Sequence, residues 1–223
     1  RALLGTNDWT ALRHPAPIRI GSASTWSAIA LGEGVTCALA DGGDLWCWGW
    51  NTFGNLGLGD RTDRTTPSRV GSASDWASVS VATVHGCAIR ADGSLWCWGA
   101  NFNGMVGVGH PRDAPVPTRV GPASGWAHVA VGSGHSCAVR TDGSLWCWGS
   151  NEHGALGMRN APLQTVPTRV GTDSDWARVS LGSLHSCGIR ADGSLWCWGD
   201  NRRHQLGLGD TRNRTVPFPV LFP

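Results

Sequence analysis

Lysine and tyrosine are absent from this 223-residue chain, and only two residues, Glu33 and Glu152, are glutamate. All 18 basic residues are therefore arginine, and with 16 acidic residues the formal net charge is only +2. So small a net charge does not favour strong nonspecific attraction to nucleic acid or to an anionic membrane. No run of about 18 apolar residues occurs. We therefore predict no nucleic-acid partner and no membrane span.

Familiar catalytic and cofactor-binding motifs are missing as well. The chain has no nucleophile–base pair, P-loop or dinucleotide-binding fingerprint, and its two G-L-G-D stretches, Gly57–Asp60 and Gly207–Asp210, are interpreted as turns. We predict a protein that is not an enzyme and that has no cofactor and no metal site. The chain begins at Arg1 rather than at a methionine, which indicates a processed or excised piece.

The chain is rich in glycine, with 32 residues, and in tryptophan, with 14, and both follow an internal repeat. The most regular part recurs at a step of fifty residues, in Thr36–Gly49, Gly86–Gly99, Ser136–Gly149 and Ser186–Gly199. Each unit reads as about four short strands with glycine-rich turns, and no helical periodicity appears. A period of about 40 to 50 residues with four strands is typical of a β-propeller blade.

The predicted fold class is therefore all-β, a propeller built from fifty-residue, roughly four-stranded blades. We expect one repeat domain over residues 1–223, with a partial unit at 1–20. The repeats are expected at 21–70, 71–120, 121–170 and 171–223.

Eight cysteines form four pairs, each ten residues apart: Cys37 and Cys47, Cys87 and Cys97, Cys137 and Cys147, and Cys187 and Cys197. With a three-residue hairpin turn at Ala91–Gly93, Arg90 faces Ser94. Counting outward, the two cysteines of that hairpin face each other at a non-hydrogen-bonded position, where Cα atoms lie roughly 4.5 Å apart. We predict four disulfides, and hence export to an oxidising compartment, extracellular or at the cell surface. Free buried cysteines and zinc ligands are the alternatives.

The repeat is most complete at Gly132–Gly149, which reads GSGHSCAVRTDGSLWCWG and is followed by Asn151 and by G-A-L-G at Gly154–Gly157. This pattern resembles the regulator of chromosome condensation repeat family in its bacterial-type, cysteine-containing form, and it covers essentially the whole chain. The resemblance implies a seven-bladed propeller, whereas this chain has four units and a partial one. A closed ring, an open arc, a fragment of a larger propeller and assembly with further chains all remain open.

Three histidines, His85, His135 and His185, precede the first cysteine of their repeats, and Val35 takes the equivalent position in the first repeat. A ring of imidazoles that binds a metal or titrates is one interpretation. We favour turn histidines that hydrogen-bond the backbone, because Val35 replaces the histidine without apparent compensation. The repeated tryptophans, such as Trp26 and Trp46, are predicted to be core.

Function in repeat folds usually resides in loops where the copies differ. The most variable stretch follows each W-C-W-G strand and holds aromatic and arginine residues, which are enriched at binding hot spots. Ordinary variable surface is the alternative. The predicted partner-binding residues are Trp50, Phe53, Phe102, Met105, Glu152, His153, Arg202 and Arg203.

We therefore predict an exported, non-enzymatic scaffold that binds a protein partner of unknown identity through the loop face of the propeller. One alternative is a structural protein that forms homo-oligomers or fibres, or that is completed by further blades. A second is a carbohydrate-binding propeller, although only Trp9 and Trp50 fall outside the repeated tryptophan positions. A third is nucleotide exchange on a small GTPase, which the four predicted disulfides and the lack of a wedge-like insertion disfavour.

Overall fold

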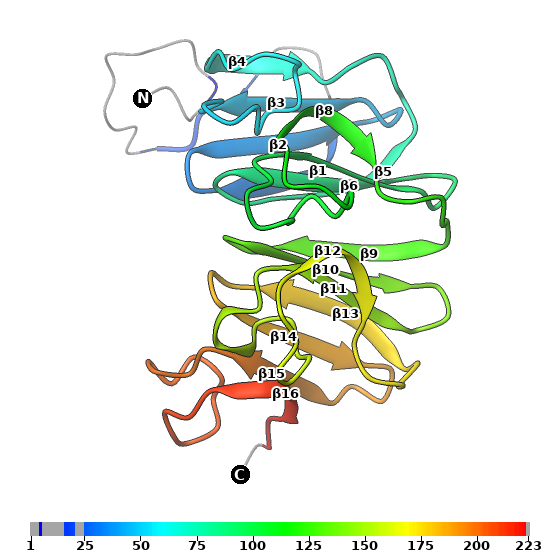
Figure 1. Ribbon diagram of the computed structural model, residues 1–223. Coiled ribbons are helices and arrows are strands. Elements are labelled where there is room, and N and C mark those ends of the chain that lie inside the picture. Colours follow the sequence, from blue (N-terminus) through cyan, green and yellow to red (C-terminus); the bar gives the residue numbers. More distant parts are fainter. Residues whose placement is uncertain (1–4, 6–15, 21–24, 222–223) are drawn as a thin grey trace.

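The chain folds into four antiparallel sheets of four strands each, stacked side by side in the computed structural model (Figure 1). The structure describes residues 5, 16–20 and 25–221, so most of the predicted partial unit at 1–20 lies outside the described residues. In each sheet the strands pair in chain order, as expected of a propeller blade. One short 3₁₀ turn, η1 (Glu152–Gly154), interrupts the all-β pattern.

The strand bounds repeat from blade to blade. Blade 1 consists of β1 (Trp26–Gly32), β2 (Val35–Ala40), β3 (Leu45–Gly49) and β4 (Arg64–Arg69). Blade 2 consists of β5 (Trp76–Val81), β6 (His85–Arg90), β7 (Leu95–Gly99) and β8 (Ala114–Arg119). Blade 3 consists of β9 (Trp126–Val131), β10 (His135–Arg140), β11 (Leu145–Gly149) and β12 (Gln164–Arg169). Blade 4 consists of β13 (Trp176–Leu181), β14 (His185–Arg190), β15 (Leu195–Gly199) and β16 (Arg214–Pro219).

The central hairpin of each blade has the predicted geometry. In blade 2 the Arg90 N–H donates to the Ser94 carbonyl at 3.0 Å, and Gly93 adopts a φ of +75°, a left-handed conformation that glycine accepts without strain. Further along the same hairpin, Cys87 lies opposite Cys97, as the register predicts.

All four predicted disulfides are present, so the eight cysteines are neither free thiols nor zinc ligands. They join Cys37 to Cys47, Cys87 to Cys97, Cys137 to Cys147 and Cys187 to Cys197. The Cα–Cα distances differ from the expectation of roughly 4.5 Å for such a position. They are 4.1 Å between Cys37 and Cys47, 4.0 Å in the second hairpin, and 4.1 Å between Cys187 and Cys197. The facing strands therefore lie slightly closer at the bridge than this expectation.

In each bridge one or both cysteine residues are buried. Cys47 is fully buried, as is its partner Cys37. In the last blade Cys197 is 3% exposed, whereas its partner Cys187 is only half-buried. The fourth bridge thus lies nearer to solvent than the first.

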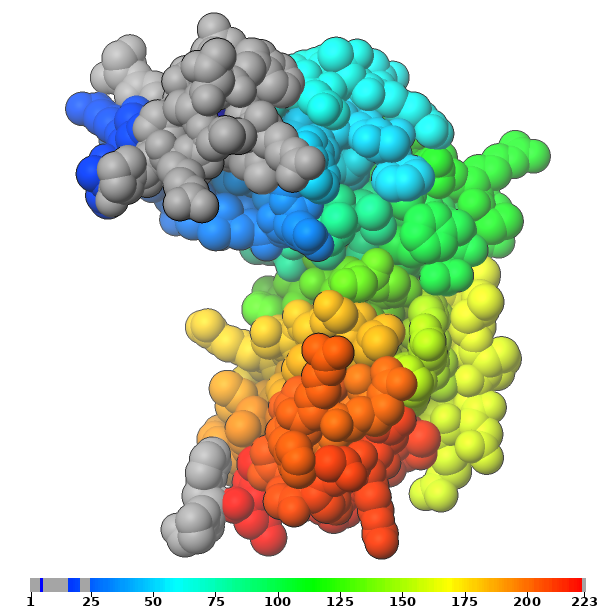
Figure 2. Space-filling view, turned by 90° about the vertical axis from the view of Figure 1, so that its left-hand side faces the viewer, coloured from blue at the N-terminus to red at the C-terminus, as the bar shows by residue number. Residues whose placement is uncertain are grey.

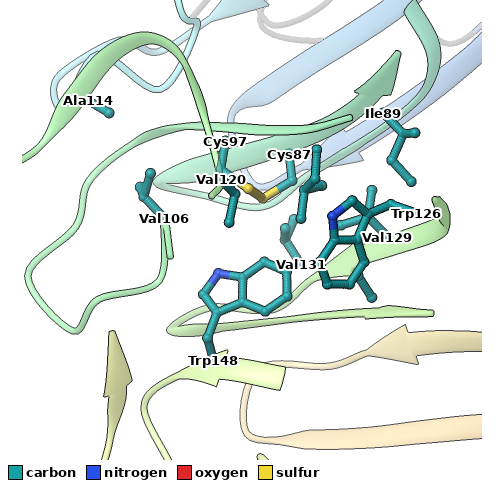
Figure 3. Close-up of a cluster of buried hydrophobic side chains, with 12 residues drawn as sticks. Cys87, Ile89, Cys97, Val106, Ala114, Val120, Trp126, Val129, Val131 and Trp148 are labelled. Atoms are coloured by element: carbon teal, nitrogen blue, oxygen red, sulfur yellow. A yellow bond between two sulfur atoms is a disulfide. The ribbon is translucent and has the colours of Figure 1, made fainter. Parts of the chain in front are cut away.

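Each disulfide of the first three blades belongs to the core between its own blade and the next one. Between blades 2 and 3, the Cys87–Cys97 disulfide and Ile89 form one buried cluster with Trp126 and Trp148 (Figure 3). The equivalent clusters lie between blades 1 and 2 and between blades 3 and 4. The core is therefore made of blade-to-blade interfaces, so each blade is buried only when both of its neighbours are present.

The tryptophans of the third strands divide into two groups. Those at the end of the third strand, such as Trp98 and Trp148, are fully buried, as predicted. Those two residues earlier are only half-buried, because they lie at the hairpin end of the blade. There the Arg90 guanidinium stacks 4.3 Å from the ring centre of Trp96 and 4.7 Å from that of Trp76. The prediction of core tryptophan is therefore too simple for Trp46 and its equivalents. In the first strands, Trp26 is also half-buried, whereas its equivalents in the other blades are buried.

The repeated histidines correct a second interpretation. His85 Nε2 lies 2.9 Å from Ser136 Oγ in the next blade, and His135 pairs with Ser186 in the same way at 3.0 Å. Both histidines are fully buried, and their partner is a side chain rather than the backbone. The replacement of the histidine by Val35 in blade 1 is accompanied by a second replacement in blade 2. The residue opposite it in blade 2 is a glycine, at position 86, so the first junction replaces both members of the pair.

In blades 1 to 3, a glycine in the loop after the third strand sits directly against the fourth, outer strand of the following blade. A Cβ added to Gly104 would lie 2.8 Å from Thr165 Cα, and the equivalent distances are 2.8 Å at Gly54 and 2.6 Å at Gly154. Backbone atoms cannot move out of the way as a flexible side chain can. In blade 4 the same position is His204, whose φ of +61° matches the left-handed φ of the three glycines, between +70° and +84°.

Replacement of such a glycine tests how tightly the blades dock. We expect Gly104→Ala to destabilise the protein by about 3 kcal/mol, because the new methyl group meets backbone and the left-handed φ disfavours alanine. The free energy of unfolding in guanidinium chloride measures the effect. His204→Ala is the matched control and should change stability by no more than about 0.5 kcal/mol, because His204 is exposed and no blade among the described residues packs against it. Equal effects of the two substitutions would contradict this account of docking.

The four blades form an arc, and the outer face of blade 1 and that of blade 4 are not covered by another blade among the described residues. On blade 1, Ile29 and Leu31 are 65% and 69% exposed, whereas their equivalents in blade 3, Val129 and Val131, are buried. On blade 4, Ile189 is 43% exposed, whereas its equivalent in blade 2 is buried. The outline is indented between the first and last blades (Figure 2). The first strands of the blades line a groove of about 520 Å³ on this side. The predicted propeller fold is confirmed, as an open arc.

No helix in the described ranges is long and apolar enough to cross a membrane.

Candidate partner-binding face

The loops that vary between repeats gather at one end of the blades. Because the four strands alternate in direction, the loop between the third and fourth strands lies at the same end as the turn between the first and second. We call this end the loop face. It comprises residues 50–63, 100–113, 150–163 and 200–213, together with the turns at 33–34, 82–84, 132–134 and 182–184.

An asparagine shapes each of these loops; it is buried in blades 1, 2 and 4 and half-buried in blade 3. Asn51 Oδ1 accepts a hydrogen bond from the Leu56 N–H at 2.9 Å, and its Nδ2 donates to the Asp60 carbonyl at 2.9 Å. The loop is then tied to the next blade, because Trp98 Nε1 donates to the Asn55 carbonyl at 3.1 Å. The equivalent residues hold their loops in the same manner, namely Asn101, Asn151 and Asn201. The loop face is therefore a rigid platform whose outward side chains differ from blade to blade.

Three of the predicted contact residues are exposed aromatic side chains on the loop face of blades 1 and 2. Trp50 and Phe53 are each 37% exposed and Phe102 is 57% exposed. Phe53 and Phe102 belong to different blades, yet their ring centres are 6.5 Å apart at an interplanar angle of 67°. Trp50 lies over the turn at Gly34, where an added Cβ would meet its ring at 2.6 Å. We call Trp50, Phe53 and Phe102 the aromatic patch.

Met105 does not belong to this surface, and its prediction as a contact residue is wrong. The residue is fully buried, and its carbonyl accepts hydrogen bonds from Trp148 Nε1 and Ser136 Oγ of the next blade. The same position of the repeat is held by Asn55 in blade 1 and Ala155 in blade 3, which are also buried.

The other predicted contact residues, Glu152, His153, Arg202 and Arg203, lie over blades 3 and 4. Arg202 Nε donates to Asp200 Oδ1 at 2.8 Å, and these hydrogen bonds lower the pKa of Asp200 to about 2. Arg202 also reaches His153 Nε2 at 3.1 Å, and Glu152 lies 3.5 Å from the same nitrogen. Arg203 is exposed, and its guanidinium has no partner within the described part of the chain.

The structure thus separates the predicted residues into an aromatic group on one half of the loop face and a charged group on the other. Trp9, the other tryptophan outside the repeated positions, lies outside the described residues. In the residues that the structure covers, no cluster of three or more histidine, cysteine or acidic side chains could hold a metal ion. The arrangement suits recognition by surface contact.

Comparison with protein families identifies the repeat. Two models of the regulator of chromosome condensation (RCC1) repeat match the chain four times each. One matches residues 42–89, 92–139, 142–189 and 192–223. The other matches residues 26–55, 78–104, 126–155 and 176–205. Together they cover most of the chain.

Individual relatives agree in fold. The chain superposes on human WBSCR16 with a TM-score of 0.82 and 24% identity, over 91% of this chain and 55% of that one. It superposes on Prp20p of Saccharomyces cerevisiae with a TM-score of 0.83 and 21% identity, over 92% and 52%. The ultraviolet-B receptor UVR8 of Arabidopsis thaliana is 43% identical over 61 residues, which are 27% of this chain and 14% of the receptor. The chain thus spans about half the length of these solved structures.

Proposed function

This chain belongs to the regulator of chromosome condensation (RCC1) repeat family, and from that premise we propose that it is an exported, non-enzymatic scaffold that binds a protein partner through its loop face. The observation that carries the proposal is the aromatic patch. Three large aromatic side chains from two blades stay exposed on the loop face, and aromatic side chains are enriched at binding hot spots.

The position of the patch supports binding rather than incidental exposure. Its residues replace small or polar ones at equivalent positions of other blades, since Trp50 corresponds to Ala100 and Phe53 to Asn103. The loops beneath are held by buried asparagines, so docking costs little loop entropy. Aromatic anchors on a preorganised surface are the usual centres of protein interfaces.

Export is proposed from the disulfides. Four disulfides are consistent with an oxidising compartment, and we place the protein outside the cell or at its surface. The intact mass of unreduced protein from its native source, alkylated in denaturant, tests this placement. We expect no alkyl groups and a mass lower by two hydrogens per disulfide. Eight alkylated thiols would exclude the placement.

Binding through the patch can be tested with a matched pair of variants. Immobilised wild-type protein is compared with Trp50→Ser/Phe53→Ser/Phe102→Ser for capture from extracellular material of the source. We expect a partner whose retention falls at least about tenfold with the patch variant, since hot-spot aromatics each contribute about 2 kcal/mol or more. The control is Val116→Ser/Val166→Ser, which removes two side chains, each 47% exposed, from outer strands. A partner lost equally from both variants, or from neither, would contradict the proposal.

Two other functions rest on weaker ground. The yeast protein Prp20p was characterised with its binding to Gsp1p and histones, but at 21% identity this likeness concerns the fold. Carbohydrate recognition would use exposed tryptophan, and among the described residues Trp50 is the tryptophan with substantial exposure on the loop face. Retention of the captured partner after enzymatic deglycosylation separates protein binding from carbohydrate binding.

A further inference from the structure

The guanidinium of Arg90, at the hairpin end of blade 2, is held by two tryptophan rings while its terminal nitrogens stay unpaired. It lies 4.3 Å from the ring centre of Trp96 and 4.7 Å from that of Trp76, and the two rings stand at 83° to each other. Trp96 is fixed in turn, because its Nε1 donates to Ser94 Oγ at 2.9 Å. Asp75 Oδ1 approaches only the Nε edge, at 3.5 Å, and within the described residues neither Nη1 nor Nη2 of Arg90 has a hydrogen-bond partner. The arginine is therefore preorganised to receive an acceptor.

The equivalent arginine of blade 4 shows which acceptor suits this arrangement. Arg190 stacks on its own pair of tryptophans, 4.8 and 4.1 Å from their ring centres, and its Nη2 donates to Asp173 Oδ2 at 2.6 Å. Asp175, the equivalent of Asp75, accepts from Nη1 at 3.3 Å. One guanidinium thus holds two carboxylates at once. The side chain of Arg190 is 16% exposed, against 26% for that of Arg90.

Blade 2 has the arginine and the two tryptophans but lacks the second carboxylate. Ala73 takes the position of Asp173, since each lies three residues before the first tryptophan of its blade. Blade 3 also has an alanine there, Ala123, but its arginine is satisfied differently, because Arg140 Nη2 donates to the Ser124 carbonyl at 2.8 Å. Among the three blades with this arginine, blade 2 is therefore the one in which the described residues leave the carboxylate position open.

The open position lies in a groove of about 630 Å³ between blades 1 and 2, a volume that suits a small organic ligand or a short peptide segment. Arg90 lines the groove at one side, and Leu58, Val70 and Val116 give it an apolar wall. The equivalent groove between blades 3 and 4 measures about 570 Å³, and Asp173 is part of its lining. The chain thus supplies a carboxylate to one groove and leaves the other without it.

We propose that the groove between blades 1 and 2 binds a ligand carboxylate, which takes on Arg90 the place that Asp173 takes on Arg190. The guanidinium presents its terminal N–H groups in a planar fork that matches a carboxylate, and the apolar wall receives the body of the ligand. Asp75 does not prevent binding, because the equivalent arginine of blade 4 holds its two carboxylates together. The carboxylate belongs to a free organic acid or to an acidic residue of a peptide segment. The site is separate from the aromatic patch and does not depend on the partner proposed for it.

Titration of nitrogen-15-labelled protein with sodium hydrocinnamate tests the proposal, with the indole N–H signal of Trp96 as the reporter. We expect a saturable shift of this signal, and binding at least about tenfold weaker for the neutral hydrocinnamamide at matched ionic strength, because the amide lacks the charge that strengthens the hydrogen bonds. The matched variant is Ala73→Asp, which supplies the aspartate of blade 4 within the chain. It should raise the Kd for hydrocinnamate at least about tenfold. Blade 4 shows that the fold accepts aspartate at this position.

The reverse substitution, Asp173→Ala, should open the second groove, so that the Trp196 signal acquires the same saturable response. A blocked tripeptide, acetyl-Leu-Glu-Leu-amide, distinguishes the two sources of the carboxylate. Tighter binding of the tripeptide than of hydrocinnamate assigns the groove to an acidic peptide segment, and weaker binding assigns it to a free organic acid. The proposal is overturned if neither carboxylate shifts Trp96 saturably, if Ala73→Asp leaves the shifts unchanged, or if Trp196 stays unresponsive in Asp173→Ala.

Discussion

Reduction of the four disulfides is expected to unfold the protein under conditions in which the oxidised form is stable. Each bridge closes a short hairpin loop with a sequence separation of 10, worth about 2.7 kcal/mol in the loop-entropy account. Four of them sum to on the order of 10 kcal/mol, as much as the whole stability of a typical domain. Guanidinium unfolding with and without a phosphine reductant measures the difference.

The position of each bridge in the arc supplies a control for this result. Cys137 and Cys147 are fully buried against blade 4, so replacing both by alanine removes packing as well as the loop constraint. The bridge between Cys187 and Cys197 lies at the open face, where Cys187 is half-buried, so replacing this pair by alanine removes chiefly the constraint. We expect the first double variant to lose about 1 kcal/mol more than the second. A reduced protein as stable as the oxidised one would refute the role given to the disulfides.

The features that sequence predicts well here are those set by neighbouring residues. The Asp-Gly turn at Asp92–Gly93 and the spacing from Cys87 to Cys97 together determine the hairpin register, because a two-stranded antiparallel pair is fixed once its turn is fixed. The same local pattern, repeated four times, determines the blade and thereby the propeller. No contact beyond a single repeat is needed for either prediction.

The features that sequence reasoning missed involve two blades. His85 and Ser136 lie 51 residues apart in the chain, and neither residue alone suggests the other. The one available signal is their joint replacement by Val35 and Gly86 in the preceding junction. Met105 was misplaced for a related reason, since its burial comes from blade 3 packing on its loop. Local strand and turn patterns do not report which side of a loop the next blade covers.

Acid is expected to destabilise the protein through the buried histidines. Burial, with a smaller effect of the next histidine along the arc, lowers the pKa of His85 to about 3 and that of His135 to about 4. In the unfolded chain both would titrate near pH 6.5. Below pH 6.5 the two histidines bind protons in the unfolded state but not in the folded state. The free energy of unfolding therefore has its full value above pH 6.5 and falls as the pH drops toward 4.

At pH 5 the loss is about 2 kcal/mol for each of these two histidines, because one pKa unit corresponds to about 1.4 kcal/mol. The partly buried His128 and His185, whose pKa values burial also lowers, act in the same direction. The turn aspartates do not contribute to the slope of the unfolding free energy in this pH range. Hydrogen bonds from the serines two residues further on lower the pKa of Asp92 and Asp142 below 3.8, so their contribution is lost only at more acidic pH. Unfolding free energies between pH 4.5 and 7.5 measure the slope.

The chain itself provides the control for this slope. His85→Val/Ser136→Gly installs at the junction of blades 2 and 3 the residues found between blades 1 and 2, where Val35 is buried opposite Gly86. The variant loses some packing at every pH. The slope of its unfolding free energy against pH should be smaller than that of the wild type by about 1.4 kcal/mol per pH unit, which is the contribution of one histidine. An unchanged slope would mean that His85 is not held neutral by the fold.

Because Ser136 Oγ donates to the Met105 carbonyl, its lone pair faces His85 and accepts the Nε2 proton. Neutral His85 therefore serves that junction as a hydrogen-bond donor between blades, and Val35 and Gly86 serve theirs by apolar packing alone.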